Sequence, residues 1–123
     1  MTTLTPTRRG RCAGKGEWQA QYQALRMTPR EAAELIRDGD VLAFAAMANW
    51  PWELDGALAD RLLETGGRVA IYGHFIPAGT RLLTPELARQ VTYDSNFYGV
   101  ERGLEAMGNV RFAPSNLSQT PAW

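Results

Sequence analysis

Side chains suited to binding a small polar ligand fall in three short segments of the chain. The first is an aromatic turn, the second holds the only histidine, and the third is a loop rich in Ser and Asn. The candidates they supply are Met47, Asn49, Trp50, His74, Ser115, Asn116 and Ser118. Amide and hydroxyl groups can hydrogen-bond a carboxylate or thioester oxygen, and indole rings can line an acyl or adenine pocket. These residue types predict a binding surface rather than a reaction centre.

Each of these segments also has a purely structural interpretation. Trp50 could cover the core, His74 could bond to backbone or water at the end of a strand, and Ser115 could shape a turn. The turn at Trp50 precedes an expected helix, whose N-terminal N–H groups can hold an anion. The residue types alone leave both interpretations open.

Motifs for catalysis and metal binding are missing from the sequence. No G-x-G-x-x-G follows a predicted strand and no G-x-S-x-G is present, while residues 10–16 (GRCAGKG) lack the spacing and the Ser or Thr of a phosphate loop. Cys12 lies in a basic N-terminal segment, far along the chain from His74, so neither a Cys-His pair nor a metal site is expected. We therefore predict no catalytic residue and no metal ligand in this chain.

The candidate residues follow strands in a pattern typical of α/β proteins. Strands are predicted at residues 41–46, 68–75 and 110–113, an ambiguous segment lies at 90–97, and helices are predicted at 28–36, 51–64, from 84, and at 100–107. This alternation indicates a doubly wound, mostly parallel sheet with crossover helices. Because such sheets bind ligands at the carboxyl ends of their strands, residues 47–52, 74–80 and 114–119 should meet at one edge.

Capping signals mark where two of these helices begin and end. Residues 28–31 (TPRE) form a capping box with Pro at the first helical position, and Gly39 suits the left-handed residue that ends this helix. The helix at 51–64 is expected to be capped by Asn49 or Trp50 and to end at the glycine pair 66–67.

Apolar periodicity predicts how two further segments pack. The continuous run at 41–46 (VLAFAA) has the pattern of a strand buried on both faces of a parallel sheet. Trp18, Tyr22 and Leu25 are spaced as one face of a short helix. We expect that face to dock on the domain.

Length and composition restrict the chain to one ordinary globular domain. It has 123 residues, of which 45% are hydrophobic and 21% charged, so a wholly disordered chain is excluded. A single cysteine excludes a disulfide scaffold, and no apolar run approaches the roughly 18 residues of a membrane span. We expect the domain to occupy residues 17–123.

The net charge of zero conceals a basic tail on an acidic body. Residues 1–16 contain four basic residues and no acid, which leaves nine basic and 13 acidic residues in the rest, a net charge of −4. An acidic body gives no electrostatic reason to bind nucleic acid. The tail is expected to be disordered, with a mitochondrial presequence as the alternative, and a cytoplasmic location is the default.

Two segments resemble the acetyl-CoA hydrolase and 4-hydroxybutyrate CoA-transferase family. Residues 32–46 (AAELIRDGDVLAFAA) are similar to its opening helix, its Asp-Gly-Asp signature and its first strand, and residues 51–62 take the place of its Pro-initiated helix. The segment from Phe97 through 110–121 (VRFAPSNLSQTP) is similar to the family's "F-x-G…R…G…Y-x-P-x-x-L-S-x-x-P" pattern. The resemblance covers about residues 28–121.

The resemblance implies a partial N-terminal CoA-transferase domain. Enzymes of this family have two tandem α/β domains, and a glutamate of the second domain attacks the thioester. No glutamate here matches that position, so the implied role of this chain is to line the acyl and carboxylate pocket. The implied partners are an acyl-CoA, a small carboxylate and a C-terminal catalytic domain or subunit, in a homo-oligomeric whole enzyme. Coenzyme A is then a substrate, and no cofactor is expected.

Two other functions remain open at the level of sequence. The chain could be a non-catalytic α/β module or degenerate subunit that pairs with a separate catalytic chain. It could also be a regulatory module that binds an anion at a helix N-terminus. In all three cases we expect no turnover from the 123-residue chain by itself.

Overall fold

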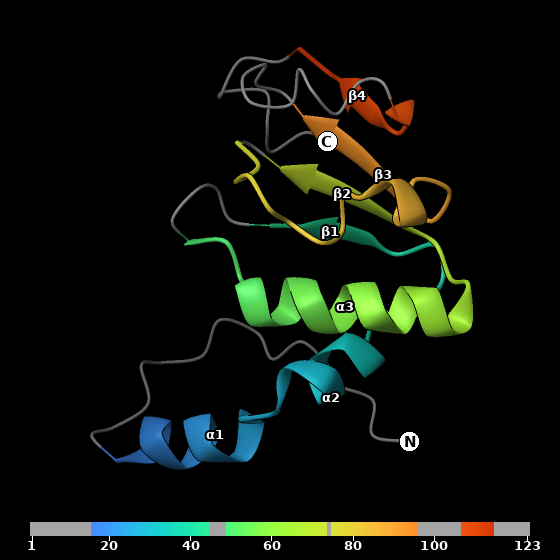
Figure 1. Ribbon diagram of the computed structural model, residues 1–123. Helices are drawn as coiled ribbons and strands as arrows, with labels where there is room; N and C mark the ends of the chain where they lie inside the picture. The colour runs from blue at the N-terminus through green and yellow to red at the C-terminus, as the bar shows by residue number, and fades with distance from the viewer. Residues whose placement is uncertain (1–15, 45–48, 74, 96–106, 115–123) are drawn as a thin grey trace.

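The centre of the fold is a four-stranded parallel sheet. The computed structural model describes residues 16–44, 49–73, 75–95 and 107–114 (Figure 1). The strands are β1 (Val41–Ala43), β2 (Val69–Gly73), β3 (Val91–Ser95) and β4 (Val110–Phe112), and they lie in the order β1-β2-β3-β4. All three pairings are parallel. The expected α/β fold with a parallel sheet is therefore confirmed, and the ambiguous segment at 90–97 is resolved as a strand.

The two described connections cover the same face of this sheet. Helix α3 (Trp52–Thr65) joins β1 to β2, and a loop with the short 3₁₀ helix η2 (Pro85–Leu87) joins β2 to β3. Right-handed crossovers between strands added in one direction all fall on one face, which accounts for this arrangement. The helix expected from residue 84 is thus only a 3₁₀ turn, and the helix at 100–107 lies almost wholly outside the described residues.

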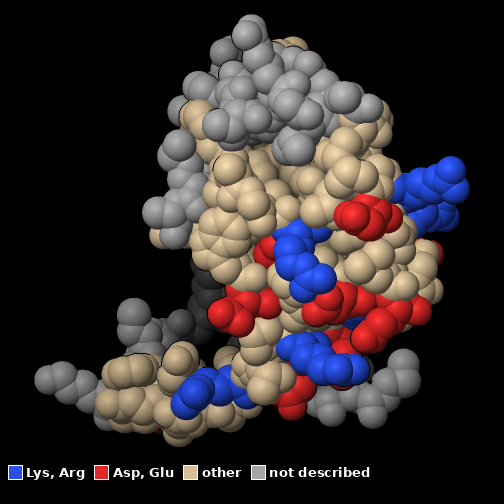
Figure 2. All heavy atoms as spheres, viewed as in Figure 1, with Lys and Arg blue, Asp and Glu red and all other residues tan. Residues whose placement is uncertain are grey.

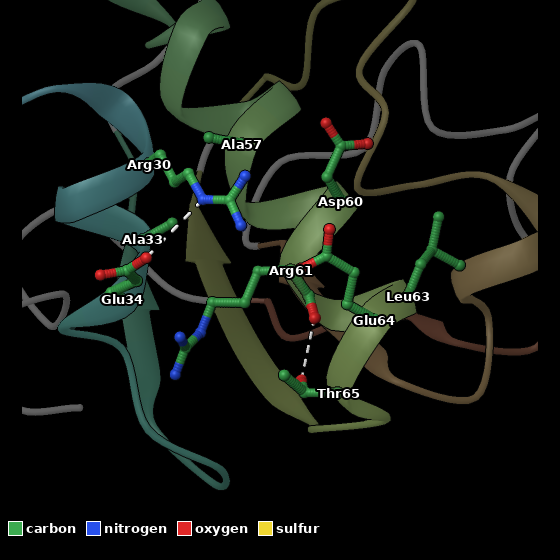
Figure 3. Close-up of a pocket in the computed structure, with 9 residues that line it drawn as sticks. All are labelled: Arg30, Ala33, Glu34, Ala57, Asp60, Arg61, Leu63, Glu64 and Thr65. Carbon is green, nitrogen blue, oxygen red and sulfur yellow. Dashed lines mark hydrogen bonds and ion pairs between the residues drawn. The ribbon is translucent and has the colours of Figure 1, made fainter.

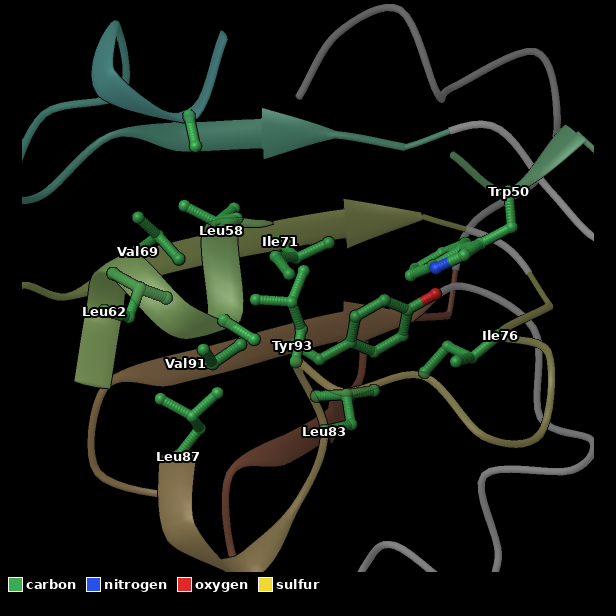
Figure 4. Close-up of a cluster of buried hydrophobic side chains, with 13 residues drawn as sticks. Trp50, Leu58, Leu62, Val69, Ile71, Ile76, Leu83, Leu87, Val91 and Tyr93 are labelled. Carbon is green, nitrogen blue, oxygen red and sulfur yellow. The ribbon is translucent and has the colours of Figure 1, made fainter. Parts of the chain in front are cut away.

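The core fills the space between α3, this loop and the sheet. Every second residue of β2 and β3 is buried, and Leu58 and Leu62 of α3 point at them (Figure 4). The buried apolar residues are Ala33, Trp50, Leu58, Ala59, Leu62, Val69, Ile71, Ile76, Leu82, Leu83, Leu87, Val91 and Tyr93. Burying a large apolar side chain contributes about 1.5–3 kcal/mol, so this single cluster holds the layers together.

No described element covers the opposite face of the sheet. In the register of the strands, Val41 pairs with Ala70 and Ala43 with Tyr72, so these residues share that face. Val41 is 73% exposed. The prediction that the run at 41–46 is buried on both faces is therefore wrong for the described part of β1, because β1 is an edge strand packed on one side only.

Helix ends follow the sequence signals, with one exception. Helix α2 (Pro29–Glu34) carries the complete capping box at its start, and Gly39 has a left-handed φ of 84° soon after its end. Helix α3 ends at Gly66, also left-handed, with φ of 71°. Its N-cap is Pro51, with no side-chain cap, which corrects the expected Asn49 or Trp50. A proline has no N–H to be satisfied, so it tolerates this position.

Helix α1 (Glu17–Leu25) forms as expected but does not pack as expected. None of its residues is buried, and Figure 1 shows it as an arm beside α2, away from the sheet. The predicted docking of its apolar face on the domain is thus wrong.

Among the described helices, α3 is the longest at 14 residues, and none is both long and apolar enough to cross a bilayer.

Candidate functional site

The carboxyl ends of all four strands lie at one edge of the sheet. Gly73 pairs with Ser95, and Ser95 pairs with Phe112, so the last residues of β2, β3 and β4 are level. Past these ends, Phe44 N donates to Tyr72 O at 3.3 Å and Ala113 N donates to Ser95 O at 2.8 Å. Residues that follow the strands are thereby held side by side, which is the geometry in which parallel sheets bind ligands.

Trp50 closes the core at this edge. Its indole is only 3% exposed and meets the ring of Phe44 edge to face, with the centroids 4.9 Å apart. Figure 4 shows the indole nitrogen directed toward the hydroxyl end of Tyr93. The Trp50 Nε1–H is buried and has no hydrogen-bond partner among the described residues. An unpaired buried donor costs about 1–3 kcal/mol, so this N–H is a ready partner for a ligand oxygen.

Gly73 leaves room for a second aromatic group at the same edge. A Cβ at this position would lie 3.1 Å from the Tyr93 hydroxyl and 3.6 Å from the carbonyl oxygen of Phe44. The buried Tyr93 ring reaches its position because residue 73 has no side chain. Glycine is favoured here by this close approach and not by backbone conformation.

The loop after β2 is held by a buried carboxylate. Asp55, in the first turn of α3 and 1% exposed, accepts hydrogen bonds from the Thr80 hydroxyl and from Arg81 N, the latter at 2.7 Å. Leu82 N also donates to it, at 3.5 Å. Nearer the sheet, Phe75 has a φ of 51°, a left-handed conformation that costs a side-chain-bearing residue of order 1–3 kcal/mol. The Asp55 contacts therefore stabilise a strained loop beside the ligand edge.

An ion pair and a cavity lie at this edge on the uncovered face of the sheet. Arg111 forms a two-pronged pair with Asp94, with Nε and Nη2 at 2.7 and 2.8 Å from the two carboxylate oxygens. Hydrogen bonding to Asp94 raises the pKa of Arg111 further above its usual value. A cavity of about 340 Å³ beside the pair is lined by Tyr72, Asp94, Arg111, Phe112 and Ala113. Its phenol and its ion-paired guanidinium and carboxylate suit a small polar molecule.

A second cleft lies away from the strand ends, between α2 and α3. It has a volume of about 390 Å³ and is lined by Arg30, Ala33, Glu34, Ala57, Asp60, Arg61, Leu63, Glu64 and Thr65 (Figure 3). Charges of both signs face each other across it, and Arg30 pairs with Glu34 at 3.7 Å. Exposed pairs of this kind are typical of a solvated helix surface. The strand edge, with a buried unpaired donor, is the stronger site candidate.

The structure places two of the seven predicted site residues. Trp50 lies buried at the ligand edge, and Asn49 lies next to it on the surface. The other five predictions, Met47, His74, Ser115, Asn116 and Ser118, lie outside the described residues. Whether any of the seven contacts substrate stays a prediction.

Two residues at this edge were missed by sequence reasoning. Tyr93 falls in the segment 90–97, whose secondary structure the sequence leaves ambiguous, so no sequence signal indicates a role for it at this edge. Asp55 had a usable signal, because it shares the helical spacing of Leu58, Ala59 and Leu62 and so belongs to the buried face of α3. An acid on an apolar face indicates a buried hydrogen-bonding role.

Metal chemistry finds no support in the described part of the chain. No group of three or more His, Cys, Asp or Glu side chains comes together there. The polar groups at the ligand edge are an indole N–H, phenols and an Arg111–Asp94 ion pair, and both oxygens of its one carboxylate are used by Arg111.

Solved structures with a similar fold are found by comparison. RipA from Yersinia pestis, a CoA-transferase-like protein, matches with a TM-score of 0.75 and 31% identity over 84% of this chain. A Glu-to-Ala variant of RipA matches with a TM-score of 0.76 and 30% identity over 85% of the chain. Each match covers 26% of the RipA chain, so this chain spans about a quarter of its length. No protein-family model matches the chain, and no curated protein does.

Proposed function

We propose that this chain, which has a CoA-transferase-like α/β fold, forms one wall of the substrate site of an enzyme acting on acyl-CoA. The reaction is transfer of CoA between an acyl-CoA and a small carboxylate, or hydrolysis of the acyl-CoA thioester. The nucleophilic glutamate that the family resemblance implies belongs to another segment or chain. The proposal assigns this chain substrate binding and orientation, without catalysis.

One observation carries the proposal: a buried, unpaired indole N–H at the carboxyl edge of a parallel sheet. Trp50 Nε1 has no described partner, and the packing against Phe44 fixes its direction. A carboxylate or thioester oxygen can accept a hydrogen bond from this N–H and would remove the cost of the unpaired donor. The cavity beside Arg111 offers further polar contacts at the same edge. These features support a small oxygen-rich ligand.

Binding can be measured on the chain itself with its tryptophan fluorescence. Acetyl-CoA and acetate are titrated into wild type and into Trp50→Phe, which keeps an aromatic ring against Phe44 but removes the N–H. We expect saturable binding that Trp50→Phe weakens about tenfold, the loss of about 1.4 kcal/mol. Trp18→Phe is the matched control, because Trp18 is 55% exposed on α1, and it should bind like wild type.

Activity assays separate this proposal from its competitors. The purified chain should show no CoA transfer and no thioesterase turnover, because it supplies no nucleophile. A robust rate from the chain by itself would overturn the assignment of a binding role. Absence of any acetate or acetyl-CoA binding would instead favour a non-catalytic α/β module.

A further inference from the structure

Helix α1 presents an apolar face that the rest of the described chain does not cover. Trp18, Tyr22 and Leu25 follow one another at helical spacing and are 55%, 58% and 62% exposed. Figure 2 shows this segment projecting from the body as an arm with few charged atoms. An isolated helix of nine residues is marginal in water, because nucleation is costly. A packing partner for this face would account for the helix.

An apolar groove lies beside the link between α1 and α2. It has a volume of about 440 Å³ and is formed where α2 and α3 begin, lined by Met27, Thr28, Pro29, Ala32, Pro51, Trp52, Glu53 and Leu54. Six of these eight residues are apolar, and two of the six are exposed, Met27 to 46% and Trp52 to 47%. The groove is thus a second apolar surface that stays exposed to solvent in the described part of this chain.

The helix cannot reach the groove of its own chain. Only residues 26–28 separate α1 from α2, and Met27 within that link is itself part of the groove wall. Arg26 and Thr28 are both extended, with ψ of 132° and 159°. A reversal of the chain needs turn conformations at such positions, and two extended residues lead the helix away instead.

We propose that α1 of a second copy of this chain occupies the groove, and that two copies exchange their α1 helices. The contact is reciprocal, so it closes as a two-fold dimer. A short, extended link that holds an element away from its own domain is the arrangement from which such exchanges arise. This inference concerns assembly and does not depend on the proposed function.

Area and charge both fit this occupant. Aromatic side chains bury 150–250 Å² each, so two half-exposed helix faces and two matching grooves remove on the order of 1,400 Å², within the range of stable interfaces. The groove carries a single charged residue, Glu53. Between Glu17 and Arg26 the helix has none, so its face enters the groove without like-charge repulsion.

Three variants with the same substitution test the exchange. Trp18→Glu places a charge on the apolar face of α1, and Trp52→Glu places a charge in the groove. Leu63→Glu is the control, because Leu63 is 50% exposed but lies outside the groove. The two tryptophans lie in the first turns of their helices, where an acid is tolerated well. Far-ultraviolet circular dichroism confirms that each variant is folded before its oligomeric state is compared.

Sedimentation equilibrium of the full chain measures the Kd of dimer formation in each variant. We expect a monomer–dimer equilibrium whose Kd rises about 30-fold in Trp18→Glu and in Trp52→Glu, as for other central interface residues, and is unchanged in Leu63→Glu. A mixture of the two tryptophan variants should recover part of the affinity, since one intact helix then meets one intact groove. A chain that stays monomeric, or a dimer sensitive to Trp18→Glu but not to Trp52→Glu, would overturn the proposal.

Discussion

The roles of single residues near the ligand edge follow from their contacts more than from their residue types. Asp55 is a buried acid whose oxygens are used by Thr80, Arg81 and Leu82. Its role is to hold residues 80–82 of the loop that leaves β2. Such a buried carboxylate is costly to disturb, because its donors lose their partner in a place water cannot reach.

Replacing Asp55 by Asn should destabilise the domain by about 2–3 kcal/mol. The amide keeps one acceptor oxygen but replaces the other by an NH2 donor, so at least one of the N–H groups that Asp55 satisfies loses its acceptor. Urea unfolding monitored by fluorescence measures the change. Asp60→Asn is the matched control, since Asp60 pairs with the same arginine, Arg81, on the surface, where ion pairs contribute little. Equal losses in the two variants would contradict the role assigned to Asp55.

Two glycine-to-alanine substitutions should have opposite effects. In Gly73→Ala the new Cβ meets the Tyr93 hydroxyl at 3.1 Å, and the overpacking should cost about 1–3 kcal/mol. In Gly56→Ala, inside α3, the nearest atom is Nη1 of Arg81 at 3.7 Å, and the better helix propensity should add about 0.5–1 kcal/mol. Thermal unfolding of both variants distinguishes them. A neutral Gly73→Ala would show that the approach of Tyr93 is not restrictive.

Sequence reasoning found Trp50 but could not decide its role. An aromatic residue in a turn before a helix fits a pocket wall and a core cover equally well. The structure shows it to be buried like a core residue and packed against Phe44, while its N–H has no partner among the described residues. The partners of a polar atom depend on tertiary contacts, which residue types do not specify.

At the scale of elements, the clearest sequence signal is the capping box of α2. Thr28 N donates to the Glu31 carboxylate at 2.7 Å, and Glu31 N donates to the Thr28 hydroxyl at 3.2 Å. The backbone hydrogen bond from Thr28, together with its hydroxyl, lowers the pKa of Glu31 below the ordinary 4.5. The unfolded chain therefore binds this proton more readily than the folded one.

Stability should consequently fall as the solution is acidified. The contribution of Glu31 is present above pH 4.5 and is lost as the pH falls through its lowered folded pKa. Asp60 and Glu86 also have lowered pKa values and act in the same direction. Glu31→Gln should reduce the slope of unfolding free energy against pH in the acid range without abolishing it. Urea midpoints at a series of acid pH values measure this, and an unchanged slope would contradict it.

Elements were predictable where a local rule determines them, and not where packing does. The caps and glycine stops of α2 and α3 use backbone chemistry within a few residues, so the sequence revealed them. The segment at 90–97 stayed ambiguous because its strand depends on pairing with β2 and β4. The docking of α1 was predicted from an apolar stripe, which shows that a helix needs a partner but not where that partner lies.

For the whole molecule, the strand order explains the position of the site. Parallel strands in the order β1-β2-β3-β4 bring the ends of all four to one edge, as the alternation of strands and helices predicted. The same order places the two described crossovers on one face, and no described element covers the other face. A pattern of apolar runs cannot predict that asymmetry, because it shows which residues avoid water without showing what covers them.

The most direct test of the central claim is amide NMR mapping of acetyl-CoA binding to the chain. Assigned backbone signals are followed during the titration, with CoA alone as a parallel arm. The account predicts that the largest shifts cluster at the carboxyl edge, at Asn49, Trp50, Gly73, Ser95 and Ala113, and that the signals of α1 stay in place. Shifts centred on the cleft between α2 and α3, or no shifts at all, would contradict a substrate site at the edge of the sheet.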